Sequence, residues 1–205
     1  MLGETEIRRI IETVIGASRA DQTEVEVFAN NSALTRFANN YIHQNVEQTD
    51  VDVRVRAVIG QKIGVASSNE TSDDALAQLA ARAFELAQHQ RENDDFRSLP
   101  RPAPVPQASS YAEATARCGP EERASVVGQI CDASSRAGLT AAGAFHTTAQ
   151  ELAVVNSLGV FAYNRETQAD INTVVMSDTS SGHAARVSKD VGEIDTEPNK
   201  QSAAA

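Results

Sequence analysis

Tryptophan is absent from this sequence of 205 residues, and aromatic residues together make up only 4% of it. Hydrophobic residues nevertheless account for 41% of the chain, which is enough to build a core. We therefore expect a core of valine, isoleucine, leucine and alanine rather than of aromatic rings. A chain of this length can form one large domain or two small ones.

Cysteine is also scarce, because Cys118 and Cys131 are the only two. They form no Cys-x-x-Cys pair, so their spacing excludes a zinc knuckle and gives no support to a disulfide framework. Cys131 follows Ile130 on an apolar helical stripe, and this position predicts a buried structural thiol.

Positive charge is in the minority. Lysine and arginine number 18 against 28 aspartate and glutamate residues, and the formal net charge is −10. Nucleic-acid backbones and anionic membranes need basic patches, so neither is an expected partner. The N-terminal segment has no uninterrupted apolar run and predicts neither a signal peptide nor a membrane span. The expected location is the cytoplasm.

Motifs for common chemistries are missing as well. There is no His-Glu-x-x-His, no Gly-x-Ser-x-Gly, and neither Gly-x-x-x-x-Gly-Lys nor Gly-x-Gly-x-x-Gly. The histidines are scattered, and each is predicted to be a surface or edge residue: His43, His89, His146 and His183. The residues alone therefore predict no catalytic residue and no metal ligand, and they give no support to an independent small-molecule enzyme.

Alternating hydrophobic and polar residues are present instead, above all in the segment 50–59. Its valines point one way and its charged residues the other. Asn39-Asn40 separates two such segments, and asparagine tolerates the positive φ angles of a tight hairpin turn. Gly60 to Gly64 is expected to close a further hairpin. An antiparallel meander is predicted, with strands at 23–29, 33–38, 41–46 and 50–59.

Helical periodicity marks three further segments. Residues 4–16 carry isoleucine and valine on one stripe, and residues 72–90 carry alanine and leucine behind a Ser72 N-cap. Four of the six prolines lie in 99–110, which predicts an extended tether. A third helix is expected after Pro120. Its apolar positions are Val126, Val127, Ile130 and Cys131.

The order of these elements repeats along the chain. Ile10 and Val126 are 116 positions apart, Phe28 and Phe145 are 117 apart, and Val53 and Ile171 are 118 apart. This small drift over a helix and several strands indicates an internal duplication of a helix plus an antiparallel meander. We predict an α+β fold with two similar sheets that pair or stack and have helices packed on them.

Four parts of the chain follow from this interpretation. Residues 1–98 are the first half, made of helix, meander and helix, and residues 99–112 are the proline-rich tether. Residues 113–195 are the second helix and meander. Residues 196–205 have no core-forming pattern and are expected to be a ragged C-terminal end.

One long segment, which begins TRFANNYIHQNV at residue 35, is similar to a known family. It continues through Val53-Arg54-Val55-Arg56, Gly60 and Gly64 to the helix at 72–90. This order of pieces resembles the N-terminal domain of the TldD/PmbA family. VVNSLGVFAYNRET, residues 154–167, resembles the second hairpin of the same domain and is closer to the PmbA (TldE) branch than to the TldD branch. The resemblance spans about residues 4–195.

The resemblance implies a role in proteolysis. The family is described as modulator of DNA gyrase, and its members are similar to subunits of a cytosolic zinc metalloprotease, a peptide hydrolase with metallopeptidase activity on unfolded peptides. In TldD-type subunits the zinc motif lies beyond this domain, whereas PmbA-type subunits lack the motif and pair with TldD-type partners in a dimer.

The same resemblance implies a non-catalytic domain that forms the wall of a substrate chamber. No residue here matches the zinc motif, so no cofactor is expected in this chain, and zinc is expected only in a full-length TldD-type subunit. The chain ends at Ala205, where the family continues with a catalytic C-terminal domain. A truncated chain that is inactive alone is therefore expected, with a TldD/PmbA-type subunit and an unfolded peptide as its partners.

Six positions carry the family signature: Arg36, Phe37, Asn39, Asn40, Gly60 and Gly64. Asparagine and glycine suit turns and Phe37 alternates into the core, so a structural role is expected for these, while the role of Arg36 stays open. An unfolded peptide could add as a strand to an exposed sheet edge. The alternative is a stand-alone protein-interaction or oligomerisation module with no proteolytic role.

Overall fold

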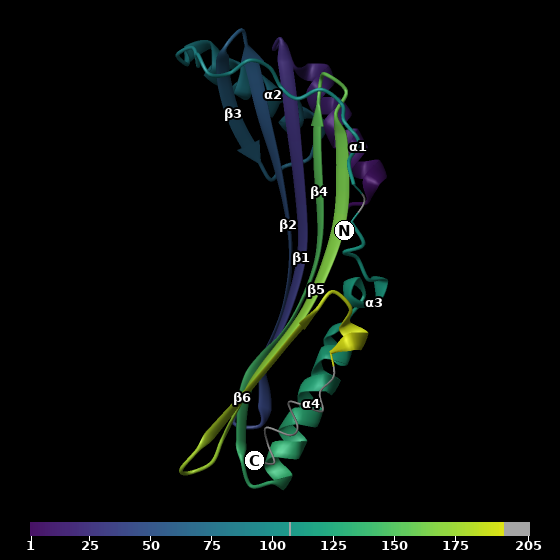
Figure 1. The fold of residues 1–205 in the computed structure, drawn as a ribbon, viewed down its shortest axis with the longest axis vertical. Coiled ribbons are helices and arrows are strands. Elements are labelled where there is room, and N and C mark those ends of the chain that lie inside the picture. Colours follow the sequence, from purple (N-terminus) through teal and green to yellow (C-terminus); the bar gives the residue numbers. More distant parts are fainter. Residues whose placement is uncertain (107, 195–205) are drawn as a thin grey trace. The chain divides into compact units, whose positions relative to one another are not determined.

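The computed structural model describes residues 1–106 and 108–194 (Figure 1). Its mixture of helices and a sheet confirms the α+β class. The elements in chain order are α1 (Glu4–Ala17), β1 (Gln22–Ala38), β2 (Tyr41–Ile59), β3 (Lys62–Ser68), α2 (Asp73–His89), α3 (Glu113–Ala116), α4 (Pro120–Arg136), β4 (Thr140–Asn156), β5 (Phe161–Met176), β6 (Ser181–Ser188) and the 3-10 helix η1 (Val191–Glu193).

The six strands form one sheet in the order β3-β2-β1-β4-β5-β6. This corrects the expectation of two separate sheets. The first strand of each meander, β1 or β4, would otherwise expose a long unpaired edge, and pairing the two strands removes both edges. The order reads the same outward from the β1–β4 pair in both directions. The internal duplication remains a prediction.

Two compact units divide the chain. Unit 1 comprises Met1–Asn30, Asp50–Ala108 and Gln150–Arg165, and unit 2 comprises Asn31–Thr49, Ser109–Ala149 and Glu166–Ala205. Each unit contains parts of β1, β2, β4 and β5. The four-part division of the sequence stays a prediction, and its last part, 196–205, lies outside the described residues.

In unit 1, helices α1 and α2 pack on the sheet face that carries the odd-numbered residues of β1, β2 and β4 together with Ala66 of β3. Ile7, Ile10, Ile11 and Val14 of the predicted α1 stripe are buried, while Ile15 is half-buried against the same core. Helix α2 begins where Ser72 Oγ accepts a hydrogen bond from the Ala75 amide. Both helices contribute to one core with the strand valines. Its central members are Ile7, Ile10, Val14, Val25, Val27, Val53, Val55, Leu76 and Ala83.

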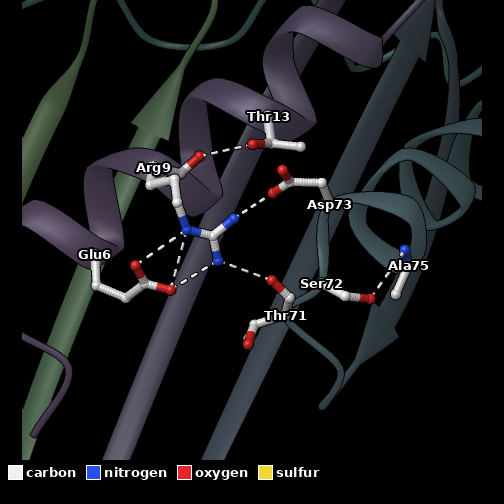
Figure 2. Close-up of polar contacts among 7 residues, drawn as sticks. All are labelled: Glu6, Arg9, Thr13, Thr71, Ser72, Asp73 and Ala75. Atoms are coloured by element: carbon white, nitrogen blue, oxygen red, sulfur yellow. Dashed lines mark hydrogen bonds and ion pairs between the residues drawn. The ribbon is translucent and has the colours of Figure 1, made fainter.

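Arg9 joins α1 to the start of α2 (Figure 2). Its guanidinium donates to both carboxylate oxygens of Glu6, to the Thr71 carbonyl at 2.8 Å and to the Asp73 carboxylate. The hydrogen bond with Glu6 is the main cause that raises the pKa of Arg9 and lowers that of Glu6. Because Asp73 lies in the first turn of α2, the contact fixes the helix start against α1.

In unit 2, α4 runs alongside the strands and covers their buried face (Figure 1). Pro120 occupies its first turn, and the Glu122 carboxylate accepts from the Gly119 amide at 2.7 Å, which caps the helix start. Val127, Ile130 and Cys131 are buried as the periodicity predicted. They pack with Phe37, Ala141, Phe145, Ala169, Ile171, Val175 and Ile194.

The strands are longer than expected. Segments 23–29 and 33–38 form the single strand β1, and 41–46 and 50–59 form the single strand β2. Neither intervening segment contains glycine or proline, so nothing interrupts the extended backbone. Asn39 and Asn40 have φ angles of 53° and 63°, which confirms the predicted hairpin turn.

Candidate functional site: an open edge of strand β2

The outer edge of β2 is covered along only part of its length. The β2–β3 register begins at Val53, opposite Ser68, and ends at Ile59, opposite Lys62. Within the described part of the chain, no strand lies on the outer side of Tyr41–Glu47, a segment that belongs to unit 2. We call Tyr41–Glu47 the open edge. Backbone amides and carbonyls along such an edge are available to pair with another extended chain.

Side chains of the open edge are exposed on both faces of the strand. Every residue from His43 to Glu47 is exposed, whereas β1 alternates between buried and half-buried positions. Tyr41 and Val46 are 58% and 46% exposed. Tyr41 also contacts His43 edge to face, with ring centroids 6.4 Å apart. Ile42 packs against the core of unit 2, but the side chains from His43 to Glu47 are largely uncovered.

A small pocket of about 100 Å³ adjoins the end of the open edge. Glu47 forms part of its wall and accepts a hydrogen bond at 3.4 Å from the Asn31 amide group. The remaining lining comes from β1, β4, the end of α3 and the turn between α3 and α4. These residues are Ala33, Thr115, Ala116, Arg117, Cys118, Gly119, Thr147, Thr148 and Ala149. The pocket lies within unit 2 and has room for one small side chain.

Arg123, in the first turns of α4, holds the open edge against the helix. Its side chain is only 1% exposed. The guanidinium donates to the Cys118 carbonyl at 2.6 Å, to Thr35 Oγ1 at 3.3 Å and to Asn45 Oδ1 at 3.3 Å. These three acceptors are neutral groups, so hydrogen bonding rather than an ion pair accommodates the buried charge. Because Asn45 belongs to the open edge, Arg123 positions that edge.

Sequence reasoning did not find Arg123, although its spacing offered a signal. It lies four positions before Val127 and seven before Ile130, on the same helical stripe. A charged residue on an apolar stripe indicates a buried, hydrogen-bonded side chain.

Glu151 is a second buried charged residue that sequence reasoning missed, and it belongs to unit 1. Its carboxylate is 1% exposed and accepts from the Leu2 amide at 2.6 Å, from the Gly3 amide and from the Tyr163 hydroxyl at 2.7 Å. Glu151 occupies an odd position of β4, where its neighbours Ala149 and Ala153 are buried. The alternation of β4 was therefore the available signal. The contacts tie the start of α1 to the sheet.

In unit 2, the signature positions gather at the β1–β2 hairpin. Arg36 is exposed, whereas Phe37 is 1% exposed in the core. The Asn40 amide group donates to the Leu139 carbonyl at 2.8 Å, and its oxygen accepts from the Ala141 amide at 2.6 Å. Asn40 therefore ties the hairpin to β4.

In unit 1, Gly60 and Gly64 lie at and after the β2–β3 turn. Gly60 has a φ angle of 59° and donates its amide to Asp21 Oδ2 at 2.8 Å. Gly64 lies within β3 rather than in the turn, which corrects the expected hairpin over Gly60 to Gly64. A Cβ at Gly64 would lie 2.2 Å from the Ala83 carbonyl oxygen of α2, so β3 and α2 pack in direct backbone contact. The six signature positions thus fall in both units and form no single site.

No metal centre is found among the described residues, because they contain no group of three or more His, Cys, Asp or Glu side chains that could hold an ion. His146 pairs with Asp170 at 3.2 Å, without a third ligand. Burial raises the pKa of the Cys118 and Cys131 thiols, and both cysteines are free and buried. Cys131 is thus a buried thiol, as predicted, and these residues do not fit a zinc ion.

No helix in residues 1–106 and 108–194 combines the length and apolarity that crossing a membrane requires.

Comparison with known proteins identifies the relatives of this fold. Residues 23–87 match the family profile described as PmbA/TldA metallopeptidase domain 1. TldE from Thermococcus kodakarensis superimposes with a TM-score of 0.81 at 14% identity, covering 97% of this chain and 46% of that chain. A putative modulator of DNA gyrase from Thermotoga maritima superimposes with a TM-score of 0.83 at 10% identity, covering 97% and 47%. A putative modulator of DNA gyrase from Bacteroides thetaiotaomicron gives 0.78 at 8% identity, covering 100% and 49%.

The chain spans about half the length of these solved proteins. No curated protein is significantly similar to it in sequence. The matched segment runs from the start of β1 almost to the end of α2, and it includes the whole β2–β3 hairpin. Residues 23–87 are thus similar to the first domain of the TldD/PmbA family, and the chain shares the fold of the solved TldE and of the two putative modulators of DNA gyrase.

Proposed function

We propose that this chain is the non-catalytic, substrate-chamber domain of a TldD/PmbA-type metalloprotease subunit that acts on unfolded peptides. One observation carries the proposal: residues 23–87 match the first domain of a metallopeptidase, while the described residues hold no group of metal ligands. Catalytic groups would then come from a C-terminal domain or from a TldD-type partner subunit in the cytoplasm. No catalytic or metal-binding role is assigned to any residue of this chain.

The sheet of unit 1 has the character that a chamber wall requires. Its helices cover only the face that carries the odd-numbered residues of β2, and Asp52 and Arg54 are exposed on the other face. Arg56 on that face pairs with Glu24 at 2.8 Å. The same face also contains Leu152, which is 42% exposed, and Val58, which is buried, so it offers both charged and apolar groups to a peptide.

Hydrolysis of casein tests this function. The purified chain alone is expected to contain no stoichiometric zinc and to release no peptides from casein. Addition of a catalytic TldD-type subunit is expected to give hydrolysis that exceeds that of the subunit alone. Stoichiometric zinc together with hydrolysis by the isolated chain would overturn the proposal.

A second candidate function is a stand-alone interaction module, and the open edge of β2 favours it. Light scattering on the chain alone and in a mixture with a TldD-type subunit separates the two functions. A self-contained oligomer that ignores the added subunit would support the interaction module. A complex that forms only in the mixture would support the chamber domain.

A further inference from the structure

Two edge strands of the sheet are protected in ways that natural proteins commonly use. β3 (Lys62–Ser68) is short, and it contains Lys62 and Gly64. β6 (Ser181–Ser188) is also short, and it contains Gly182 and Arg186. Short length, a cationic side chain and glycine all discourage the addition of another strand. Neither edge is suited to bind an extended chain.

A third stretch of edge is covered by the chain itself. The β5–β6 register ends at Ala169, opposite Ser188, and β5 continues in the other direction without β6. There the Thr167 amide donates to the Ser110 carbonyl at 2.9 Å, and the Ala112 amide donates to Thr167 Oγ1 at 2.9 Å. Residues 109–112 have neither helix nor strand structure. A short extended segment thus already occupies this edge.

The open edge of β2 has the corresponding position on the other side of the sheet. Its covered part ends at Val53, just as that of β5 ends at Ala169. The open edge, Tyr41–Glu47, contains no lysine, arginine, glycine or proline. Among the described residues, no segment covers it as 109–112 covers β5. It is as short as β3, but it lacks the cationic side chains, the glycine and the covering segment that protect the other three edges.

We propose that the open edge of β2 binds an extended peptide strand through backbone hydrogen bonds. This inference rests on the proposed function and names the place where the unfolded substrate docks. Arg123 and Thr35 hold Asn45 in place, so the edge is ordered before the peptide arrives. The pocket beside Glu47 receives one peptide side chain, while the backbone contacts tolerate many sequences.

A peptide is favoured over a second copy of this chain as the occupant. Edge-to-edge pairing of two copies would bring together two chains that each carry a net charge of −10, and like charge opposes such association. An unfolded peptide carries no such penalty. It can also reach the edge as a single chain segment, as residues 109–112 reach Thr167 of β5.

The test uses a fluorescein-labelled peptide of alternating threonine and glutamine, which is neutral and unstructured. Fluorescence anisotropy is expected to show saturable binding to the full chain. A peptide N-methylated at alternate residues has the same charge but cannot form the backbone ladder, and it is expected to bind at least about tenfold more weakly, because each net hydrogen bond contributes about 1 kcal/mol. Equal binding of the two peptides would overturn the proposal.

Matched variants locate the binding edge. Val46→Lys and Gln44→Lys place a cation on the open edge and are expected to weaken binding about tenfold, because lysine opposes strand addition. Val187→Lys places the same change on β6, where Val187 is 63% exposed, and is expected to bind as the unchanged chain does. Peptide binding should also slow amide hydrogen exchange within Tyr41–Glu47. Equal weakening by Val187→Lys, or no protection of the open edge, would refute the proposal.

Two further readouts separate this inference from the proposed function. If light scattering shows a dimer that Val46→Lys disrupts, the occupant is a second copy and the peptide proposal is wrong. If Val46→Lys leaves the stimulation of casein hydrolysis by the chain unchanged, the edge proposal is wrong while the chamber function stands. If the unchanged chain binds peptide at this edge but never stimulates hydrolysis, the chamber function is wrong while the edge proposal stands.

Discussion

At the scale of single residues, two buried charged side chains fix the positions of their neighbours. Glu151 accepts hydrogen bonds from the Leu2 and Gly3 amides and from the Tyr163 hydroxyl. Arg123 donates a hydrogen bond to Asn45 of the open edge. Both side chains are 1% exposed. A buried charge costs free energy unless it is fully hydrogen-bonded, so each residue fixes the position of the groups that satisfy it.

Replacing Glu151 with alanine is expected to lower the free energy of unfolding by about 3 kcal/mol, because its buried donors lose their acceptor. Glu151→Gln should cost less, since the amide oxygen can still accept. Urea unfolding measures both. The exposed Glu12 on α1 provides the control, and Glu12→Ala should change stability by less than about 0.5 kcal/mol. Equal losses for Glu151→Ala and Glu12→Ala would show that the contact with the N-terminal segment is unimportant.

The stability of the protein at alkaline pH tests the contact between Glu151 and Tyr163. Burial first, and then the hydrogen bond to Glu151, raise the pKa of Tyr163 above the ordinary tyrosine value of 10.0. As pH rises past about 10, the unfolded chain loses its phenol proton before the folded chain does, so the stability that Tyr163 contributes is present below that pH and is lost above it.

Tyr163→Phe should therefore lose stability less steeply than the unchanged chain above about pH 10. Urea unfolding over a pH series measures the slope. Tyr41→Phe, at a ring that is 58% exposed, controls for the loss of a phenol elsewhere. Identical slopes for Tyr163→Phe and the unchanged chain would contradict the buried hydrogen bond.

At the scale of elements, two glycines show how differently the same residue is used. Gly64 in β3 lies against α2, where a Cβ would be 2.2 Å from the Ala83 carbonyl oxygen and 2.3 Å from the Ala87 nitrogen. Gly128 in α4 has no atom within 4 Å of the corresponding point. The first glycine permits a close strand–helix contact, and the second only lowers helix propensity.

Alanine at these two positions should therefore change stability in opposite directions. Gly64→Ala is expected to lower the free energy of unfolding by about 3 kcal/mol, because backbone atoms on both sides must move. Gly128→Ala is expected to raise it by about 1 kcal/mol through helix propensity. Thermal and urea unfolding check both variants. A neutral Gly64→Ala would mean that β3 and α2 are not in backbone contact.

Helices were predictable from sequence, because periodic apolar stripes identify them locally. The stripe Ile7, Ile10, Ile11 and Val14 defined α1 to within one residue of its observed end, and Ser72 marked the start of α2. The continuity of β1 and β2 was not found, because polar residues at 30–32 and 47–49 resemble a loop when their strand neighbours are unknown. The four-residue helix α3 has too short a pattern to detect.

The sequence could predict that some sheet edge is exposed, but not which one. An exposed sheet edge was expected, but identifying it requires strand order and register, which depend on contacts between distant residues. The offset between the two meanders gave the correct element order and still led to two sheets instead of one. The pairing of β1 with β4 joins parts of the chain that are more than a hundred residues apart, and no local pattern reports it.

At the scale of the whole molecule, the proposed function is that of a scaffold. The chain spans about half the length of its solved relatives, and its described residues contain no group of metal ligands. Its two compact units each have their own apolar core, formed from helices and shared strands. The proposed chamber function assigns the shaping and admission of a substrate to this chain and the chemistry to another domain or subunit.

Native mass spectrometry of the chain mixed with a catalytic TldD-type subunit tests this account most directly. We predict a mass equal to the sum of one copy of each, with zinc carried by the catalytic subunit alone. Two separate species at concentrations that saturate such complexes, or zinc bound to this chain, would contradict the account.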